Sequence, residues 1–280
     1  MKLTSINKNL ERIAIALEKL QVNSNKNCDL LSFEGYYWNT VIKNLSSVKS
    51  IDRFPLESLK GISSQKDILY KNTKAFSLGH NANNTLLWGA RGTGKSSLIK
   101  SIHGDLIKNG INIGLVEISK EDLHDLPYLI KILSEVDRRF IVFCDDLSFD
   151  KNDKAYKTLK VVLEGGLFGK PKNIVFYATS NRRHIIERDN FSFNTFNEKE
   201  SHEEKISLSD RFGLWIGFHS IDQETYFDII LWYVKYYKIP ISEKIAKEES
   251  LKWSVLRGNR SGRTAFQYII DLAIKKNIKI

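Results

Sequence analysis

Residues 86–97 of this chain read Leu86-Leu87-Trp88-Gly89-Ala90-Arg91-Gly92-Thr93-Gly94-Lys95-Ser96-Ser97. The apolar start, the three glycines and the Lys-Ser pair predict the end of a buried strand, a tight turn and the start of a helix. Because glycine adopts left-handed backbone angles, such a turn brings its N–H groups against the oxygens of a phosphate group. The helix that follows directs its positive end at the same point. This stretch therefore predicts a phosphate-binding loop in an α/β domain.

Two side chains of the loop have predicted contacts of their own with a bound nucleotide. Lys95 is long enough to reach the β- and γ-phosphates, and the hydroxyl of Ser96 is a ligand for magnesium. A glycine turn that precedes Lys-Ser by chance is the alternative, which the flanking strand and amphipathic helix disfavour. The residues predicted to bind the nucleotide are Gly89, Ala90, Arg91, Gly92, Thr93, Gly94, Lys95, Ser96 and Ser97.

Length and composition are those of a globular protein with one nucleotide-binding domain and helical additions, or with two small domains. The chain has 280 residues, and no apolar run in it approaches the ~20 residues of a membrane helix. We expect no secretory signal at the start, and Cys28 and Cys144 are typical of unpaired thiols in a reducing cytoplasm. We therefore expect a cytoplasmic protein without a membrane partner. The net charge of +10 permits contact with nucleic acid, but the scattered lysines favour a generally basic surface.

The apolar pattern divides the chain into a helical N-terminal region (1–60), an α/β nucleotide-binding domain (61–219) and a helical C-terminal lid (220–280). In the first region, the stripe from Ile6 to Leu20 predicts one helix, and the aromatic-rich stretch 36–48 predicts another. Docking of both helices onto the chain's own core is the favoured interpretation, and a surface for a partner is the alternative.

The second region alternates strands with helices, which predicts a mainly parallel five-stranded sheet with helices on both faces. The predicted strands are 85–88, 111–118, 140–144, 174–179 and 214–218. The predicted helices begin at Lys95, near Leu123, near Ala155 and near Ser207. The polar stretch 189–205 predicts a loop. In the lid, a helix through residue 235 ends before Pro240, and two more helices complete the chain.

The apolar strand 140–144 ends in two carboxylates, Asp145 and Asp146. In open α/β sheets, ligands bind at the carboxyl ends of the strands. We expect Asp145 to hold magnesium through water, and Asp146 to orient or deprotonate the water that attacks a phosphate. A strand that ends in an Asp-rich turn is the alternative, which the phosphate loop upstream disfavours.

Strand 174–179 also ends in small polar residues. The side-chain amide of Asn181 there is suited to hydrogen-bond the γ-phosphate and the attacking water, and Thr179 or Ser180 are possible substitutes. Asparagine at a strand end also forms turns, so a purely structural role stays open. The basic residues 182–184 favour a solvated turn over a contact with phosphate or nucleic acid.

Two arginines that do not belong to these strand ends are also candidates for contacts with the phosphates. Arg211 precedes the last strand, where its planar fork can reach the γ-phosphate of a neighbouring subunit in a ring. A local salt bridge to Asp210 is the alternative. Arg263 opens the last helix, where a helical lid folds back onto the phosphates of its own subunit. Arg257 and Arg260 fit a basic surface loop as well as they fit a functional role.

The order of these motifs resembles that of the AAA+ ATPases, and most of all the bacterial family of predicted ATPases named DUF815, a domain of unknown function. The similarity is carried by residues 81–97, 143–148, 177–184 and 204–215, and the first ~30 residues carry little of it. The resemblance implies an AAA+ P-loop sheet with a helical lid, binding of ATP and Mg²⁺, and homo-oligomers in the form of a ring or a helix.

The resemblance also assigns roles to single residues. It makes Lys95 and Ser96 the functional pair of the Walker A loop, and Asp145 and Asp146 the Walker B acids. It makes Asn181 the first sensor, Arg211 the arginine finger and Arg263 the second sensor. The catalytic residues expected are thus Asp146, Asn181, Arg211 and Arg263, and the metal ligands expected are Ser96 and Asp145.

Together these features predict an ATPase that hydrolyses ATP to drive rearrangement of an oligomer or of an unknown client protein. Two alternatives stay open: an ATP-gated nucleic-acid-binding protein of the loader or initiator kind, and an ATP-binding switch with little turnover. AAA+ proteins most often carry glutamate where Asp146 stands, so the sequence leaves the turnover rate open.

Overall fold

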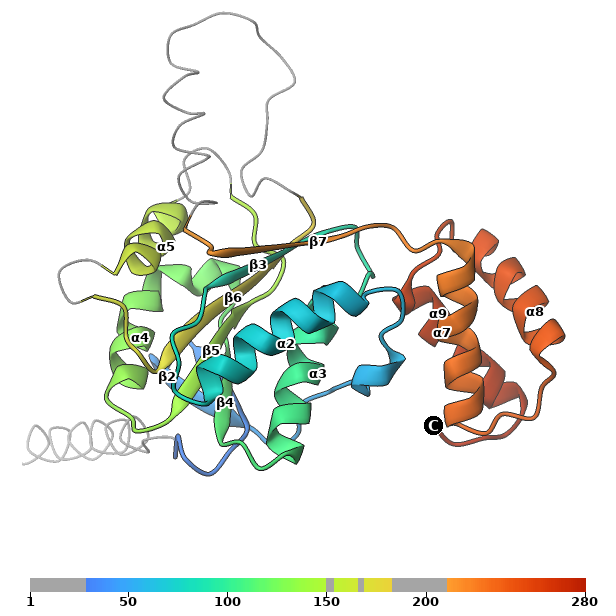
Figure 1. The fold of residues 1–280 in the computed structure, drawn as a ribbon, viewed down its shortest axis with the longest axis horizontal. Coiled ribbons are helices and arrows are strands. Elements are labelled where there is room, and N and C mark those ends of the chain that lie inside the picture. Colours follow the sequence, from blue (N-terminus) through green and yellow to red (C-terminus); the bar gives the residue numbers. More distant parts are fainter. Residues whose placement is uncertain (1–28, 150–153, 166–168, 183–210) are drawn as a thin grey trace, which may run out of the picture.

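The computed structural model describes residues 29–149, 154–165, 169–182 and 211–280. Within them, a twisted sheet carries helices on both faces, and a separate group of helices lies beside it (Figure 1). The sheet has seven strands in the order β2-β1-β4-β5-β6-β3-β7. The strands are β1 (Gly35–Asn39), β2 (Asn44–Val48), β3 (Thr85–Gly89), β4 (Ile113–Glu117), β5 (Arg139–Cys144), β6 (Ile174–Ser180) and β7 (Leu214–Phe218).

Seven α-helices and two short 3-10 helices accompany these strands within the same residues. The α-helices are α2 (Ser63–Ser77), α3 (Lys95–Lys108), α4 (Leu126–Ser134), α5 (Lys154–Glu164), α7 (Gln223–Tyr236), α8 (Glu243–Leu256) and α9 (Gly262–Lys275). The 3-10 helices are η1 (Leu56–Ser58) and η2 (Lys120–Asp125).

Five of the strands form the predicted parallel sheet. Strands β4, β5, β6, β3 and β7 are neighbours in that order and pair in parallel, which confirms the α/β prediction for this part of the chain. Alternate residues of β5 serve opposite faces. Phe140 and Val142 pack with the leucines of α4 and α5, whereas Ile141 and Phe143 pack with the apolar side chains of α2 and α3. A strand buried on both faces is therefore apolar throughout.

Residues 36–48 form a β-hairpin, so the prediction of a helix there is wrong. Tyr36 and Trp38 are 1% and 4% exposed, whereas Tyr37 between them is 45% exposed. This alternation has the period of a strand. β1 pairs in parallel with β4, and β2 returns antiparallel to β1, so the hairpin adds two strands to one edge of the sheet. The stripe between residues 6 and 20 lies outside the described residues.

Most of the other described helices begin at or near the predicted residues. Helix α3 begins at Lys95 as predicted, and α5 begins at Lys154. Near Leu123 the chain first forms η2, and α4 follows from Leu126. Helix α2 is not among the predicted helices. The predicted helix near Ser207 and the predicted loop at 189–205 lie outside the described residues.

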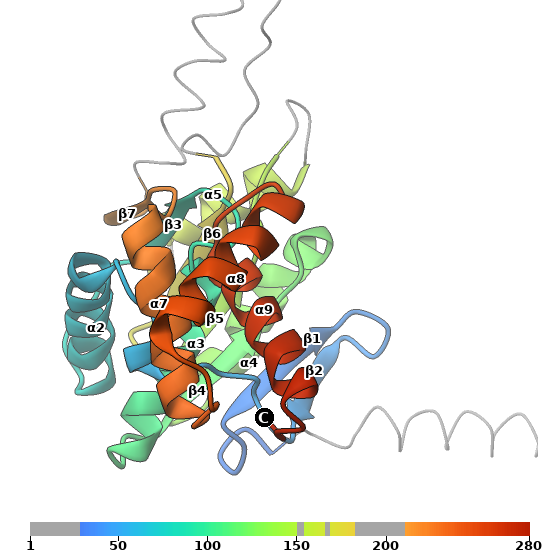
Figure 2. The same ribbon diagram turned by 90° about the vertical axis from the view of Figure 1, so that its right-hand side faces the viewer.

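Helices α7, α8 and α9 form the lid, which has an apolar core of its own. Each begins at a polar N-cap residue whose side chain accepts a backbone N–H three residues ahead, which stabilises the helix start. The caps are Asp222, Ser242 and Ser261. Figure 2 shows the three helices from the side, in orange and red, in front of the sheet. Among the described residues, no helix has the length and apolar character needed to span a bilayer.

A buried histidine on α3 connects the sheet to the segment after the hairpin. His103 is fully buried, with Nδ1 3.0 Å from an Arg53 guanidinium nitrogen and Nε2 3.0 Å from the carbonyl oxygen of Ile113. Because arginine only donates hydrogen bonds, Nδ1 accepts and the Nε2–H donates to Ile113. Burial, the largest cause, lowers the pKa of His103 to about 4.

This lowered pKa predicts a loss of stability in acid. The unfolded chain protonates His103 near its ordinary pKa of about 6.5, whereas the folded chain stays neutral down to about 4. Acid therefore favours unfolding, and the free energy of unfolding is expected to fall by about 2 kcal/mol between pH 7.5 and pH 5 from this group. Urea unfolding at the two pH values measures it. His103→Gln, which keeps one acceptor and one donor, should lose this part of the dependence, and an equal dependence in both proteins would contradict the assignment.

Candidate active site

The loop between β3 and α3 is a tight glycine turn at the carboxyl edge of the sheet. Gly89, Gly92 and Gly94 have φ angles of 137°, 74° and 95°, in the left-handed region that favours glycine. Neighbouring chain also approaches two of them closely. A Cβ on Gly89 would lie 1.9 Å from the carbonyl oxygen of Phe218, and a Cβ on Gly92 would lie 2.8 Å from the Cβ of Ser261. The turn thus requires glycine for its shape and for its packing.

Lys95 extends along this loop and is only 7% exposed. Its ammonium donates to the carbonyl oxygens of Gly89 at 2.9 Å and Ala90 at 2.7 Å, and to Oδ1 of Asn181 at 3.3 Å. Burial lowers the pKa of Lys95, and the nearby carboxylates of the site oppose this shift. A phosphate in the loop would offer the ammonium charged acceptors in place of neutral carbonyls, and charge-assisted hydrogen bonds are the stronger kind.

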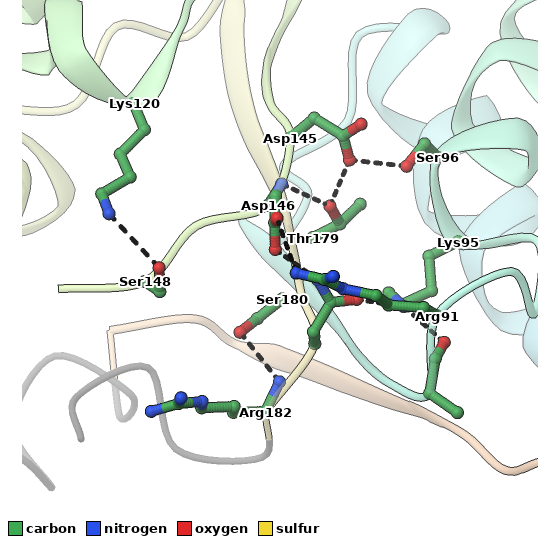
Figure 3. Close-up of polar contacts among 12 residues, drawn as sticks. Arg91, Lys95, Ser96, Lys120, Asp145, Asp146, Ser148, Thr179, Ser180 and Arg182 are labelled. Carbon is green, nitrogen blue, oxygen red and sulfur yellow. Dashed lines mark hydrogen bonds and ion pairs between the residues drawn. The ribbon is translucent and has the colours of Figure 1, made fainter.

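The carboxylates of the two acids at the end of β5 have separate partners (Figure 3). Oδ1 of Asp145 accepts from the hydroxyl of Ser96 at 2.5 Å and from the hydroxyl of Thr179. The carboxylate of Asp146 accepts from the amide of Asn181 at 2.5 Å and lies 3.8 Å from the guanidinium of Arg91. The Asp145 carboxylate therefore contacts the start of α3 and Thr179 of β6, whereas the Asp146 carboxylate contacts Asn181, the residue after β6.

The donor set at Ser96 and Asp145 fits magnesium. This ion takes oxygen ligands and is usually held by one or two carboxylates together with substrate phosphates and water. The Ser96 hydroxyl and the Asp145 carboxylate already lie within hydrogen-bond distance of each other. The loop amides and Lys95, one residue before Ser96, would hold the phosphates beside this site. The phosphate oxygens would then be further ligands of the metal.

The lid closes the other side of the same cavity, whose volume is about 660 Å³. The backbone N–H of Gly262 donates to the carbonyl oxygen of Gly92 at 2.9 Å, so α9 begins directly at the phosphate loop. Arg263 follows and lines the cavity. An apolar wall lies beyond it, and its lining side chains are Phe54, Ile62, Ile229, Tyr233 and Phe266. A cavity with one polar and one apolar end fits a nucleotide with its phosphates and its base.

The aromatic part of this wall was not among the predicted site residues. The Phe266 ring lies 5.0 Å from that of Phe54 and 5.2 Å from that of Tyr233, between ring centroids. The three rings come from the segment before η1 and from two lid helices. Nothing local to any one of them indicates a ligand, so only their meeting in space identifies the wall.

The structure brings most of the predicted residues together in this cavity. Its lining includes residues 91–97 of the loop, Asp145, Asp146, Asn181 and Arg263. Gly89 and Ala90 form the base of the loop, where their carbonyls accept from Lys95.

Arg211 lies elsewhere on the molecule. Its guanidinium forms an ion pair with Glu164 at the end of α5, at 2.7 Å, and it is about two-fifths exposed. Asp210, the alternative partner, lies outside the described residues.

The remaining basic candidates have contacts away from the cavity. Arg257 lies over the ring of Trp253, and Arg260 donates to Gln223 at 3.3 Å. The backbone N–H of Arg182 donates to the hydroxyl of Ser180 at 3.2 Å, and residues 183 and 184 lie outside the described part.

A family model described as "Protein of unknown function (DUF815)" matches residues 32–276 of the chain. The chain belongs to the DUF815 family. This membership agrees with the resemblance that the motifs of the sequence carry. A search of curated proteins finds no match to this DUF815 chain.

The DUF815 chain shares its fold with solved AAA+ P-loop proteins. The Aeropyrum pernix ORC1 protein in complex with DNA matches 81% of this chain and 66% of its own, at 12% identity and a TM-score of 0.52. A single-substitution variant of Thermotoga maritima RuvB matches 77% of this chain and 62% of its own, at 18% identity and a TM-score of 0.51. The Thermotoga maritima RuvB Holliday junction branch migration motor matches with a TM-score of 0.49, and the DUF815 chain spans 60% of its length. At these identities the likeness concerns the fold alone.

Proposed function

We propose that this protein binds ATP with Mg²⁺ in the cavity between sheet and lid and hydrolyses the γ-phosphate bond, so that the nucleotide state rearranges an oligomer or a client protein. One observation carries the proposal. The phosphate loop, the pair Asp145-Asp146 and Asn181 come from three segments far apart in the sequence, yet they line one cavity and are joined by hydrogen bonds.

Binding of the triphosphate rests on the loop. Its backbone N–H groups and the ammonium of Lys95 contact the phosphate oxygens, and the start of α3 adds its positive end. Ser96 and Asp145 would hold the magnesium ion, whose positive charge would stabilise the negative charge that develops on the phosphates. The aromatic wall of Phe54, Tyr233 and Phe266 holds the base.

Hydrolysis rests on Asp146 and Asn181. The amide of Asn181 donates to Asp146 through Nδ2, while its Oδ1 accepts from Lys95. Asn181 therefore keeps the carboxylate of Asp146 beside the ammonium that contacts the phosphates. A water between that carboxylate and the γ-phosphate is oriented for attack, and Asp146 is the group that accepts its proton.

Two arginines take up the charge of the transition state in this proposal. Arg263 does so from the lid of the same subunit, since it lines the cavity. Arg211 is exposed and outside its own cavity, so its role requires a neighbouring copy whose cavity it completes. The active form is accordingly a homo-oligomer, in a ring or a helical arrangement.

Calorimetry and phosphate release on the full chain test this function. With Mg²⁺ present, ATP and ADP are expected to bind with a measurable heat. Phosphate release from ATP is expected at a rate per protein chain that rises with protein concentration, because oligomers form. Binding without turnover, under all concentrations and with candidate partners, would instead identify an ATP-dependent switch. No heat with either nucleotide would contradict the proposal as a whole.

Nucleic acid is the second candidate partner, since the chain has a net charge of +10. One structural neighbour, the Aeropyrum pernix ORC1 protein, is described in complex with DNA. Affinity for DNA that requires ATP and falls steeply with salt would support this function, because phosphate contacts release counterions. A pull-down with Asp146→Asn, which is expected to retain ATP, would separate a protein client from nucleic acid.

A further inference from the structure

Thr179, on β6, places a single hydroxyl between the two acids of the site (Figure 3). The residue is 1% exposed, so this hydroxyl has little access to water. It contacts the carboxylate of Asp145 and the backbone N–H of Asp146. Thr179 therefore contacts both the proposed metal ligand, Asp145, and the proposed water-activating residue, Asp146. These two acids are adjacent in the sequence but have different proposed roles.

The direction of both hydrogen bonds follows from the groups involved. A carboxylate only accepts, so the hydroxyl of Thr179 donates its proton to Oδ1 of Asp145. Its oxygen then accepts the N–H of Asp146, at 2.9 Å. The hydroxyl donates in one contact and accepts in the other, so one side chain binds both acids at once. Valine, which has the same shape, offers neither.

At Asp145, the contact with Thr179 fixes the orientation of the carboxylate. Ser96 donates to the same oxygen, Oδ1, at 2.5 Å. With both hydroxyl protons directed at Oδ1, the lone pairs of Ser96 and the other carboxylate oxygen remain for a metal ion. Hydrogen bonds from outside the ligand set commonly orient metal ligands in this way.

At Asp146, the contact with Thr179 holds an unusual backbone conformation. Asp146 has a φ of 52°, in the left-handed region that few residues other than glycine adopt. Its N–H is held by the Thr179 hydroxyl, and the N–H of Leu147 donates to the Thr179 carbonyl at 2.7 Å. Two consecutive N–H groups thus bind one residue of β6, and this turn places the Asp146 carboxylate against Asn181.

We propose that Thr179 is a positioning residue that fixes the metal-binding carboxylate of Asp145 and the backbone of Asp146 together, so that the metal site and the water-activating acid keep one relative geometry. The inference rests on the proposed ATPase function and names a residue that acts through others. Thr179 also lines the cavity, but in this role it acts through Asp145 and Asp146.

Two substitutions in the full chain separate the hydroxyl from the shape of the side chain. Thr179→Val removes the hydroxyl, and Thr179→Ser keeps it. Thr85→Val is the matched control, because Thr85 is also buried, lies on the neighbouring strand β3 and has a hydroxyl that donates to the carbonyl of Asn83. The probe is AMP-PNP, a non-hydrolysable ATP analogue, titrated by calorimetry at graded Mg²⁺. ATP turnover is measured in parallel.

Thr179→Val is expected to raise the Mg²⁺ concentration that gives half-maximal strengthening of AMP-PNP binding, and to lower kcat, each by about 10- to 100-fold. Binding without Mg²⁺ and KM at saturating Mg²⁺ should stay unchanged, since the phosphate loop is intact. Thr179→Ser and Thr85→Val should resemble the natural protein. A merely structural role would lower the melting temperature without moving the Mg²⁺ midpoint.

The outcomes distinguish this inference from the function on which it rests. If the natural chain shows no Mg²⁺-dependent AMP-PNP binding, the proposed function fails. If it does, and Thr179→Val has the same Mg²⁺ midpoint and kcat, only the role of Thr179 is overturned, and a Thr179→Ser variant as defective as Thr179→Val overturns it equally. Should Thr179→Val not fold, Thr179→Cys replaces it, because a thiol is a weak donor and acceptor, and an unchanged midpoint there also overturns the proposal.

Discussion

Lys95→Ala is expected to lower the affinity for ATP by about 10²-fold, which corresponds to the loss of hydrogen bonds between a charged donor and the phosphates. The effect is large because the ammonium is 7% exposed and lies where a phosphate would replace the carbonyls of Gly89 and Ala90. Calorimetric titration with ATP and Mg²⁺ measures the change, and turnover should be lost with it.

The control for this prediction is Lys100→Ala. Lys100 lies on the same helix, five residues further from the loop, and is outside the cavity lining. Its loss also removes one positive charge, so it reports how much of the effect comes from the general field of the protein. Equal ATP affinity in Lys95→Ala and the natural chain would contradict the assignment of the phosphate loop. A melting curve without nucleotide shows whether either variant has lost its fold.

Arg211→Ala is expected to lower kcat by about 10³- to 10⁵-fold, the range for an arginine that stabilises phosphoryl transfer from a neighbouring subunit. ATP affinity should change little, because the residue pairs with Glu164 and lies outside the cavity of its own chain. Turnover at saturating ATP measures the first quantity and calorimetry the second. Arg257→Ala is the control, since Arg257 is an exposed arginine whose contact is the ring of Trp253.

A mixing experiment tests whether Arg211 acts on a neighbour. Arg211→Ala subunits keep their own acids, and Asp146→Asn subunits keep their own Arg211. Neither is expected to turn over ATP alone. In mixed oligomers, an Asp146→Asn subunit can supply its arginine to the intact acids of an Arg211→Ala neighbour, so part of the activity should return. No recovery across all mixing ratios would show that Arg211 does not act between subunits.

The parts of the protein that were predicted correctly are those whose signals are local. A buried parallel strand is apolar along its whole length, so the runs around Leu86 and Ile141 identify strands without any tertiary information. The glycine turn and the position of the two acids at the end of β5 also follow from a few adjacent residues, and their role in nucleotide chemistry stays a prediction. For the same reason the start of α3 at Lys95 was predicted at the correct residue.

The hairpin was misjudged because an aromatic-rich stretch has no unambiguous period. Within β1 the alternation of Tyr36, Tyr37 and Trp38 covers too few residues to exclude a helix. Their pairing with β4 and the hydrogen bond from Trp38 to Asp125, at 3.2 Å, stabilise the strand. Both partners lie about 80 or more residues further along the chain. Such long-range contacts override local propensity.

The sequence by itself determined the parallel sheet, the glycine turn before Lys95 and the place of Asp145 and Asp146 at the end of β5, because each follows from the kinds of residue in one short run. Only the tertiary structure placed the hydroxyl of Thr179 between those acids and brought Gly262 of the lid to Gly92. It also directed Arg211 to Glu164, away from its own cavity. These are contacts between segments far apart in the chain, and their geometry depends on how sheet, helices and lid pack, which no single stretch of residues encodes.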